Sequence, residues 1–507
     1  MTERMPNMQI APDQIDSDAA KVVQRLRDNA HLAYLVGGCV RDLLLKRKPK
    51  DFDVVTSATP NEIKRLFNNC RIIGRRFRLA HIFYGPKIIE TSTFRANPRE
   101  LEDEDAGGDE SGDLLIRRDN VFGTPEEDAR RRDFTINGLF YDTKTGQVID
   151  HVNGLVDLEA RVVRTIGDPD IRFREDPIRI LRAVKFAARC ELTIEPETYR
   201  RMMEHRDEIR KCAQARVSEE FYRLLRAGAA KRSMELLVET DLLEIFAPEI
   251  ARELRATAED AGEDLIKRRA RFWGYLAALD RSTERKPTAP SNALILAALL
   301  LPPLREALDP STRGVRDIGQ LIAQSIAPAL ERLKPSRRDS ELARQILLAL
   351  RYLLPGANPR QRQNLRGREF YDDAVRLAEI VADAEALDPS ILVAGAAAPE
   401  GGEAQAELEG GFDEGLPPEL ESLEPDGGRR RRRGRRGRIR EGAREGGGAV
   451  HAAPAPQNGR THLGPREAVP VDLDGLLAAT RSLLASSSRP AFLGSGSFGG
   501  PWSSRVE

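Results

Sequence analysis

The sequence predicts an α+β fold: an N-terminal domain built on a mixed sheet, then helical domains, then a long disordered C-terminal region. Short apolar runs of strand character are concentrated in residues 32–94. After Gly167, apolar residues recur at helical spacing. From residue 388 the composition shifts to small, proline and charged residues, which cannot form a core. A chain of 507 residues, 40% of them hydrophobic, is long enough for several folded domains.

The expected organisation places five segments in order along the chain. They are a flexible leader at 1–18, a mixed-sheet domain at 19–165, helical domains at 166–255 and 256–387, and a disordered region at 388–507. The mixed-sheet domain is expected to contain helices at 19–30, from Val40, and at 58–69, and strands at 32–36, 51–56, 70–74, 79–85, 87–94, 134–142 and 147–150. The clearest helical runs after it lie at 178–192, 218–228, 232–250, 292–301 and 342–354.

Charge is segregated along the chain, although the formal net charge is zero. Residues 96–113 are acidic and glycine-rich, and we expect a mobile surface loop there. Residues 393–428 are also acidic, and a stretch with ten arginines from Arg429 to Arg444 follows them. An Arg/Gly stretch of this kind attracts phosphate without choosing a sequence, so it favours RNA contact. A solubilising tail or a partner-binding arm are the alternatives.

Nothing in the sequence indicates a membrane or an oxidising compartment. The N-terminus has no apolar signal core, and the longest apolar run, Ala293–Leu301, is too short to cross a bilayer. The four cysteines are scattered and form no CxxC pair, so a zinc knuckle is not expected. We therefore expect a cytoplasmic protein without membrane contact.

Two acids two residues apart give the first chemical signal. Asp51 and Asp53 lie in the predicted strand 51–56, where alternate side chains share one face. Two carboxylates on one face repel each other unless a cation lies between them. Mg²⁺ prefers carboxylates together with phosphate oxygens, and Mn²⁺ is an alternative. A lone DxD is more often a pair of surface or capping acids, so the context must decide.

A glycine turn shortly before these acids supplies that context. Gly37 and Gly38 end a predicted strand and open a helix. Such a turn lets backbone N–H groups approach a phosphate closely. Arg41 lies on the first turn of that helix and can add positive charge at the same phosphates. Together with Asp51 and Asp53, the turn predicts a nucleotide site with bound metal ions.

The segment LVGGCVRDLLLKRKPKDFDVVTSATP resembles the signature of the class II nucleotidyltransferase superfamily. That superfamily includes CCA-adding tRNA nucleotidyltransferases and bacterial poly(A) polymerases. The resemblance covers roughly residues 30–250. It implies a catalytic head at 19–165, a helical neck at 166–255 that recognises the nucleotide base, and a helical body and tail at 256–387 that bind RNA.

The resemblance also implies a third active-site acid, for which the sequence offers two candidates. Asp133 lies in RRDFTINGLFYD, which resembles the second motif of the family, and is our first choice. Glu90 lies in a strand that could run beside the acid pair and is the second choice. In the same motif, Arg132 matches the arginine that touches the incoming nucleotide. Arg131 is expected to be structural, and Asn137 could bind the ribose.

Base selection is expected from FREDPIRILRAVKF, which resembles the EDxxR motif of the family. Asp176 and Arg179 are three residues apart and would be neighbours on a helix. A carboxylate accepts from the adenine 6-amino group, and an arginine donates to a ring nitrogen, so the two can imitate a Watson–Crick edge. The alternative is an ordinary ion pair between them.

Three further positions are implied around this helix. The family uses basic residues that match Arg182 and Lys185, and ideal helix geometry turns Lys185 almost opposite to Asp176. In the segment ARVSEEFYRLL, Glu219 or Glu220 is expected to brace the base-reading helix.

The segment GRRFRLAH, with Arg75, Arg76 and Arg78, is similar to the bacterial poly(A) polymerase subgroup. It implies polyadenylation of RNA 3′ ends without a template, in RNA processing and decay. AMP would pass from ATP with release of pyrophosphate by a two-metal mechanism, and the partners would be ATP and the 3′ ends of mRNA or small RNA. A CCA-adding enzyme that uses CTP and ATP is the alternative. A non-catalytic RNA-binding protein is a weaker one, because a dead scaffold has no need for the acids above.

Overall fold

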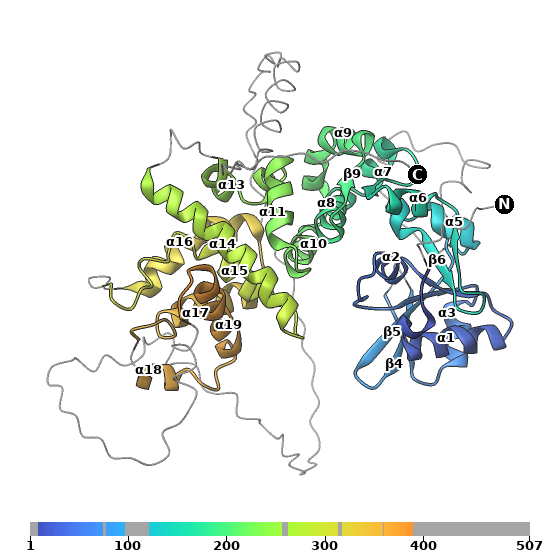
Figure 1. Cartoon of the computed structure of the whole chain (residues 1–507), viewed down its shortest axis with the longest axis horizontal. Coiled ribbons are helices and arrows are strands. Elements are labelled where there is room, and N and C mark those ends of the chain that lie inside the picture. Colours follow the sequence, from blue (N-terminus) through green and yellow to red (C-terminus); the bar gives the residue numbers. More distant parts are fainter. Residues whose placement is uncertain are drawn as a thin grey trace, which may run out of the picture. The chain divides into compact units, whose positions relative to one another are not determined.

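The computed structural model describes residues 9–74, 78–96, 121–255, 262–312, 317–357 and 359–388. The predicted acidic loop after Ala96, the arginines Arg75 and Arg76, and the predicted disordered tail lie outside these residues. Figure 1 shows most strands in the N-terminal part, followed in the described chain by helices and the short strand β9. The predicted α+β fold is confirmed for this part of the chain.

The head carries a seven-stranded mixed sheet in the order β3-β4-β5-β2-β1-β6-β7. Its elements are η1 (Pro12–Gln14), α1 (Ser17–Asp28), β1 (Ala33–Val36), α2 (Gly38–Leu44), β2 (Asp53–Thr56), α3 (Pro60–Leu66), β3 (Cys70–Ile73), β4 (Leu79–Tyr84), β5 (Lys87–Thr93), α5 (Pro125–Arg130), η2 (Thr135–Asn137), β6 (Leu139–Asp142), β7 (Gln147–Asp150), α6 (Gly154–Glu159) and β8 (Val162–Val163). The pair β2 and β5 is parallel, and the other neighbours are antiparallel.

The neck and body are helical apart from β9, which pairs with β8. Their elements are α7 (Pro169–Glu175), α8 (Ile178–Cys190), β9 (Thr193–Ile194), α9 (Pro196–Glu204), η3 (Arg206–Lys211), α10 (Gln214–Arg226), α11 (Ala230–Glu239), α12 (Leu243–Phe246), α13 (Pro248–Arg255), α14 (Glu263–Arg285), α15 (Asn292–Leu300), α16 (Ile318–Leu333), α17 (Arg337–Leu350), α18 (Pro359–Asn364) and α19 (Tyr371–Ala384). None of the helices in the described ranges is long and apolar enough to cross a membrane.

Apolar side chains explain why these elements pack where they do. Helix α8 buries residues around most of its circumference, including Leu181, Val184 and Phe186, because α10 and α11 pack against it. Helix α15 is apolar on every side, and all but one of its residues are buried between α14, α17 and α19. A helix that is hydrophobic all round belongs in a core. Residues 293–300 of this apolar run are therefore part of the core.

Several element boundaries differ from the sequence prediction, and the predicted helical run 232–250 is divided into α11, α12 and α13. Helix α1 begins at Ser17, inside the predicted flexible leader, because Asp16 caps it by accepting from the backbone N–H groups of Asp18 and Ala19. The predicted strand 134–142 is interrupted by the 3₁₀ turn η2, so its regular strand is limited to Leu139–Asp142. Strand β2 starts at Asp53, so Asp51 lies just outside it.

Candidate active site

One cleft of about 1280 Å³ gathers the residues that the sequence singled out. Its lining includes every predicted catalytic and nucleotide-binding residue, namely Gly37, Gly38, Arg41, Asp51, Asp53, Arg132, Asp133, Asp176, Arg179, Arg182 and Lys185. These residues come from the head and the neck, up to 148 positions apart in the chain (185 − 37). Their convergence is the central finding of the structure.

The glycine turn between β1 and α2 is shaped by a backbone conformation that favours glycine. Gly37 has φ 73° and ψ −121°, and its N–H donates to the Leu139 carbonyl at 3.0 Å. A Cβ at this position would lie 3.1 Å from Nη1 of Arg132. A side chain at residue 37 would therefore strain the backbone and crowd the arginine that lines the same cleft.

The side chain of Arg41 is buried, and most of its N–H groups are bonded to other residues of the protein. Its side chain is 2% exposed, its Nε and Nη2 donate to Oδ1 of Asp42, and its Nη1 donates to Oδ1 of Asn137 at 2.5 Å. It also lies over the Phe186 ring. Arg41 lines the cleft, but these bonds leave few N–H groups for a phosphate, so its predicted phosphate contact stays a prediction.

Both acids of the pair line the cleft, but their side chains differ in exposure to solvent. Asp51 is exposed, whereas Asp53 is partly buried at the start of β2. Burial and the charges of Glu90 and Asp51 raise the pKa of Asp53 to about 6, although Arg132 opposes the rise. Crowded carboxylates of this kind fit a site that takes cations. The parallel pairing of Val54 with Thr91 explains why Glu90 flanks Asp53.

The two candidates for the third acid differ in their surroundings. Asp133 is buried and accepts hydrogen bonds from Arg182, from Nδ2 of Asn137 at 3.0 Å and from the backbone N–H of Phe134 at 2.8 Å. Burial alone would raise the pKa of Asp133, but the Arg182 charge and these bonds hold it well below its usual range. Glu90 is 51% exposed, and its charge reaches Asp53. Asp133 lines the cleft but is paired within the protein, whereas Glu90 lies beside Asp53 and is not among the residues that line the cleft.

The predicted helical neighbours Asp176 and Arg179 do not share a helix. Helix α7 ends at Glu175, and Asp176 caps it before Pro177 opens α8. Asp176 pairs with Arg216 at 3.0 Å, and Arg179 donates to Glu175 at 3.0 Å. Each of these two described residues is thus paired with a third residue, and the alternative of an ion pair between Asp176 and Arg179 is not observed. Both side chains still line the cleft.

Lys185 is largely buried, with 12% of its side chain exposed, and forms an ion pair with Glu220 of α10. Because Asp176 lies outside α8, the helical-wheel argument that turned Lys185 away from it does not apply. Burial and the Arg182 charge lower the pKa of Lys185 to about 8, against the opposing effect of Glu220. Glu220 thus contacts α8 through Lys185, whereas Glu219 pairs along its own helix with Arg223.

Several basic residues in the cleft were missed by the sequence prediction. They are Lys50, Arg189, Arg216, Arg223, Arg226 and Lys286. Lys286 follows the last residue of α14, a region where no motif was recognised. Only the fold brings these side chains together, so no local spacing could have revealed them.

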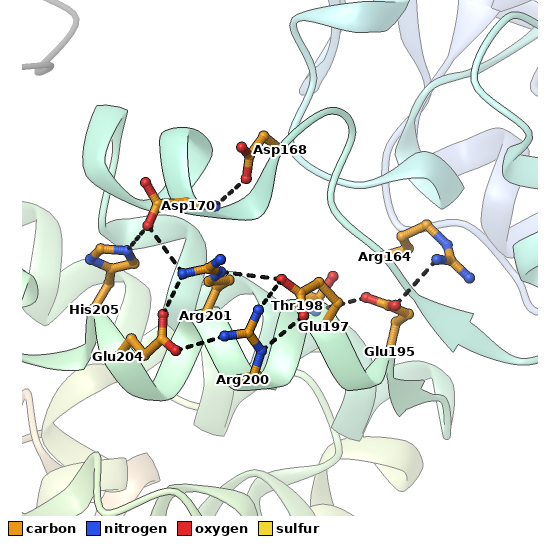
Figure 2. Close-up of polar contacts among 10 residues, drawn as sticks. All are labelled: Arg164, Asp168, Asp170, Glu195, Glu197, Thr198, Arg200, Arg201, Glu204 and His205. Atoms are coloured by element: carbon orange, nitrogen blue, oxygen red, sulfur yellow. Dashed lines mark hydrogen bonds and ion pairs between the residues drawn. The ribbon is translucent and has the colours of Figure 1, made fainter.

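A second polar cluster lies in the neck, between α7 and α9 (Figure 2). Among the described residues, Asp170, Glu204 and His205 present ligand atoms within 4.8 Å of one another. However, Arg201 already reaches both carboxylates, at 3.7 Å from Asp170 and 2.8 Å from Glu204. These carboxylates are neutralised by arginine, so we assign no metal ion to the cluster.

Comparison with known proteins identifies the class to which this fold and site belong. Residues 33–164 match the family model of the poly A polymerase head domain, and residues 191–254 match that of the probable RNA and SrmB-binding site of polymerase A. A CCA-adding enzyme of Limosilactobacillus fermentum is 34% identical over 322 residues, which cover 62% of this chain and 77% of that enzyme. The chain belongs to the nucleotidyltransferase family that includes poly(A) polymerases and CCA-adding enzymes.

Within that family, poly(A) polymerase I shows the higher identity. The protein of that name from Salmonella typhi is 44% identical over 269 residues, which cover 52% of this chain and 58% of the relative. The one from Haemophilus influenzae is 38% identical over 303 residues, which cover 59% and 65%. The chain thus spans less than two thirds of the length of the poly(A) polymerases it matches.

Proposed function

We propose that this protein is a template-independent adenylyltransferase that extends RNA 3′ ends with AMP from ATP and releases pyrophosphate. The observation that carries the proposal is the single cleft that collects the acid pair, the glycine turn and the base-reading residues. The 44% identity to poly(A) polymerase I supports ATP as the substrate. A role in RNA processing and decay, on mRNA or small RNA, follows from the same proposal.

Asp51 and Asp53 are the residues that would hold Mg²⁺ or Mn²⁺, with Glu90 as the favoured third acid. Burial, together with the charges of Glu90 and Asp51, raises the pKa of Asp53, and a bound cation would stabilise its ionised form. When bound, two ions supply activation of the attacking hydroxyl and stabilisation of the leaving pyrophosphate. The remaining steps depend on how the side chains hold ATP and RNA.

The triphosphate would lie against the turn at Gly37 and Gly38, where backbone N–H groups and Arg132 can donate to its oxygens. Adenine would lie against Asp176 and Arg179. The Asp176 carboxylate keeps lone pairs beyond those that face Arg216, so it can still accept from the 6-amino group. The RNA primer would follow the basic residues of the cleft, since these attract its phosphates.

A CCA-adding activity is the second candidate, because a CCA-adding relative is matched over 77% of its length. Such an enzyme would accept CTP as well as ATP and stop after the C, C and A are added. The two functions differ in nucleotide choice and in product length, so one assay separates them.

The test uses the purified full chain with Mg²⁺, a labelled RNA primer or a tRNA that lacks its CCA end, and each nucleoside triphosphate separately. A long ladder with ATP alone supports polyadenylation. Addition limited to C and A on tRNA would overturn the proposal in favour of the second candidate. Asp53→Ala should abolish extension, and retained activity would contradict the metal assignment.

A further inference from the structure

Asp128 makes a buried contact with the arginine beside the glycine turn. It lies on α5, four residues before Arg132, and its Oδ2 accepts from Nε of Arg132 at 3.1 Å and from Nη2 at 2.9 Å. Its other oxygen, Oδ1, accepts from the backbone N–H of Arg95 at 3.1 Å. The Asp128 side chain is 5% exposed. The carboxylate is therefore fixed on one side by the segment that follows β5 and holds the arginine on the other.

This contact determines which edge of the Arg132 guanidinium faces the cleft. Nε and Nη2 face Asp128, whereas Nη1 lies 3.5 Å from the Asn137 carbonyl and next to the space above Gly37. The guanidinium also lies over the Phe140 ring, at 5.6 Å from its centre. An arginine side chain is otherwise free to adopt many rotamers. The carboxylate and the ring together leave it one orientation, with Nη1 at the turn.

A second acid–arginine pair, which lies wholly on α5, provides an internal comparison, whereas Arg132 lies just past the end of that helix. Glu126 and Arg130 are also four residues apart, and Arg130 Nη2 lies 2.6 Å from Glu126. Both side chains are more than half exposed, and neither lines the cleft. The spacing alone is therefore ordinary on this helix. What distinguishes Asp128 is its burial and its link to an arginine in the nucleotide site.

We propose that Asp128 is a positioning residue for the incoming triphosphate: it fixes the Arg132 guanidinium so that Nη1 faces the glycine turn. The inference rests on the proposed function, since it assigns the triphosphate to that turn. A carboxylate beside an arginine reduces the positive charge that the triphosphate meets. An orienting role of Asp128 and a purely electrostatic role therefore predict opposite changes in ATP affinity when its charge is removed. Loss of the Asp128 charge tightens ATP binding if charge dominates and weakens it if orientation dominates.

The experiment measures equilibrium binding of ATP to the full chain with Mg²⁺ and without primer, and then kcat and KM for primer extension. We expect Asp128→Asn to weaken ATP binding and to raise KM about tenfold, with kcat within about twofold of the wild type. Glu126→Gln, which removes the exposed acid at the same spacing, should change neither quantity. Tighter ATP binding by Asp128→Asn would overturn the inference.

The double variant separates positioning from a general structural effect. In an Arg132→Ala background, Asp128→Asn should weaken ATP binding no further, because the arginine it orients is gone. An equal loss in both backgrounds would overturn the proposal. If Asp128→Asn does not fold, Arg132→Lys is measured instead. A lysine ammonium cannot donate to Asp128 from one edge and direct a second edge to the glycine turn, as the guanidinium does. The Arg132→Lys variant should reproduce the rise in KM, and an unchanged KM would count against the inference.

These readouts keep the two proposals distinguishable. A wild-type chain that binds ATP but extends no primer contradicts the proposed function, while the binding comparison still decides the role of Asp128. An Asp128→Asn variant that binds ATP as the wild type does, in a chain that makes poly(A), contradicts only the positioning role.

Discussion

Arg182 donates from Nε to Oδ2 of Asp133 at 2.6 Å, and its Nη2 forms an ion pair with the same oxygen at 2.5 Å. The contact joins α8 of the neck to the residue two positions before the 3₁₀ turn η2 of the head, 49 residues earlier in the chain. It also holds the pKa of Asp133 below its usual range in spite of burial. An acid that is already paired in this way has less capacity to bind a cation, and this bears on the identity of the third acid.

Glu90→Gln and Asp133→Asn are expected to fail in different ways. Glu90 is 51% exposed, so its loss should leave stability nearly unchanged and lower turnover by about 100-fold if it holds a cation. Asp133→Asn breaks a buried pair whose arginine is 33% exposed, which should cost about 2–3 kcal/mol. Urea unfolding and primer extension against Mg²⁺ concentration measure both effects. A stable but inactive Asp133→Asn beside an active Glu90→Gln would assign the role to Asp133.

The raised pKa of Asp53 predicts a pH-dependent gain in stability for Asp53→Asn. A folded pKa of about 6, above the ordinary 3.8, means that the ionised acid destabilises the fold at neutral pH. Because Asp53 keeps some solvent contact, we expect the variant to be about 1–3 kcal/mol more stable at pH 7.5 without metal ions. The gain should shrink as pH falls through 6 and vanish below about 4. Thermal unfolding in EDTA across this range measures it, and a gain independent of pH would contradict the cause.

The glycine turn and the acid pair that line this cleft could be predicted from the sequence because both are local motifs. The glycine turn and the acid pair lie within 17 residues, from Gly37 to Asp53, and the turn needs the positive φ that glycine provides. Buried strands and helices were likewise visible from their apolar spacing. Element boundaries were less accurate, because capping by Asp16 and the start of β2 at Asp53 depend on individual side chains and pairings.

Partners distant in sequence could not be predicted in the same way. Asp176 was placed on a helix with Arg179, but it precedes a proline, and residues before proline avoid the helical region. The proline after Asp176 is a local signal from which one could have predicted that Asp176 and Arg179 do not share a helix. No such signal exists for Arg216, which reaches Asp176 from 40 residues away only after α10 packs against α8.

Glu220 and Glu219 offer a matched pair of variants on α10. Glu220 is 5% exposed and pairs with Lys185, whereas Glu219 is 45% exposed and pairs with Arg223. Glu220→Gln leaves the buried ammonium without its counter-ion, which should cost about 2–4 kcal/mol at pH 7. Glu219→Gln should cost less than about 0.5 kcal/mol. Urea unfolding of both variants measures the difference.

The penalty of Glu220→Gln should fall as pH rises. Lys185 has a pKa lowered to about 8 in the folded chain, so it releases its proton between pH 7 and 9 and no longer needs a counter-ion. Glu219→Gln should show no such trend. A penalty equally large at pH 7 and pH 9 would mean that packing, and not the charge of Lys185, makes Glu220 important.

The arginine-rich segment 429–444 should contribute affinity for RNA without contributing to chemistry. Ten arginines attract phosphates non-specifically, and such binding weakens steeply with salt. Deletion of residues 394–507 should therefore raise the KM for an RNA primer about tenfold at 0.1 M salt, flatten its dependence on salt, and leave kcat unchanged. Deletion of residues 445–507 alone retains the arginines and should behave as the full chain does. If both truncated proteins bind RNA equally well at every salt concentration, the segment has another role, such as solubility or contact with a protein partner.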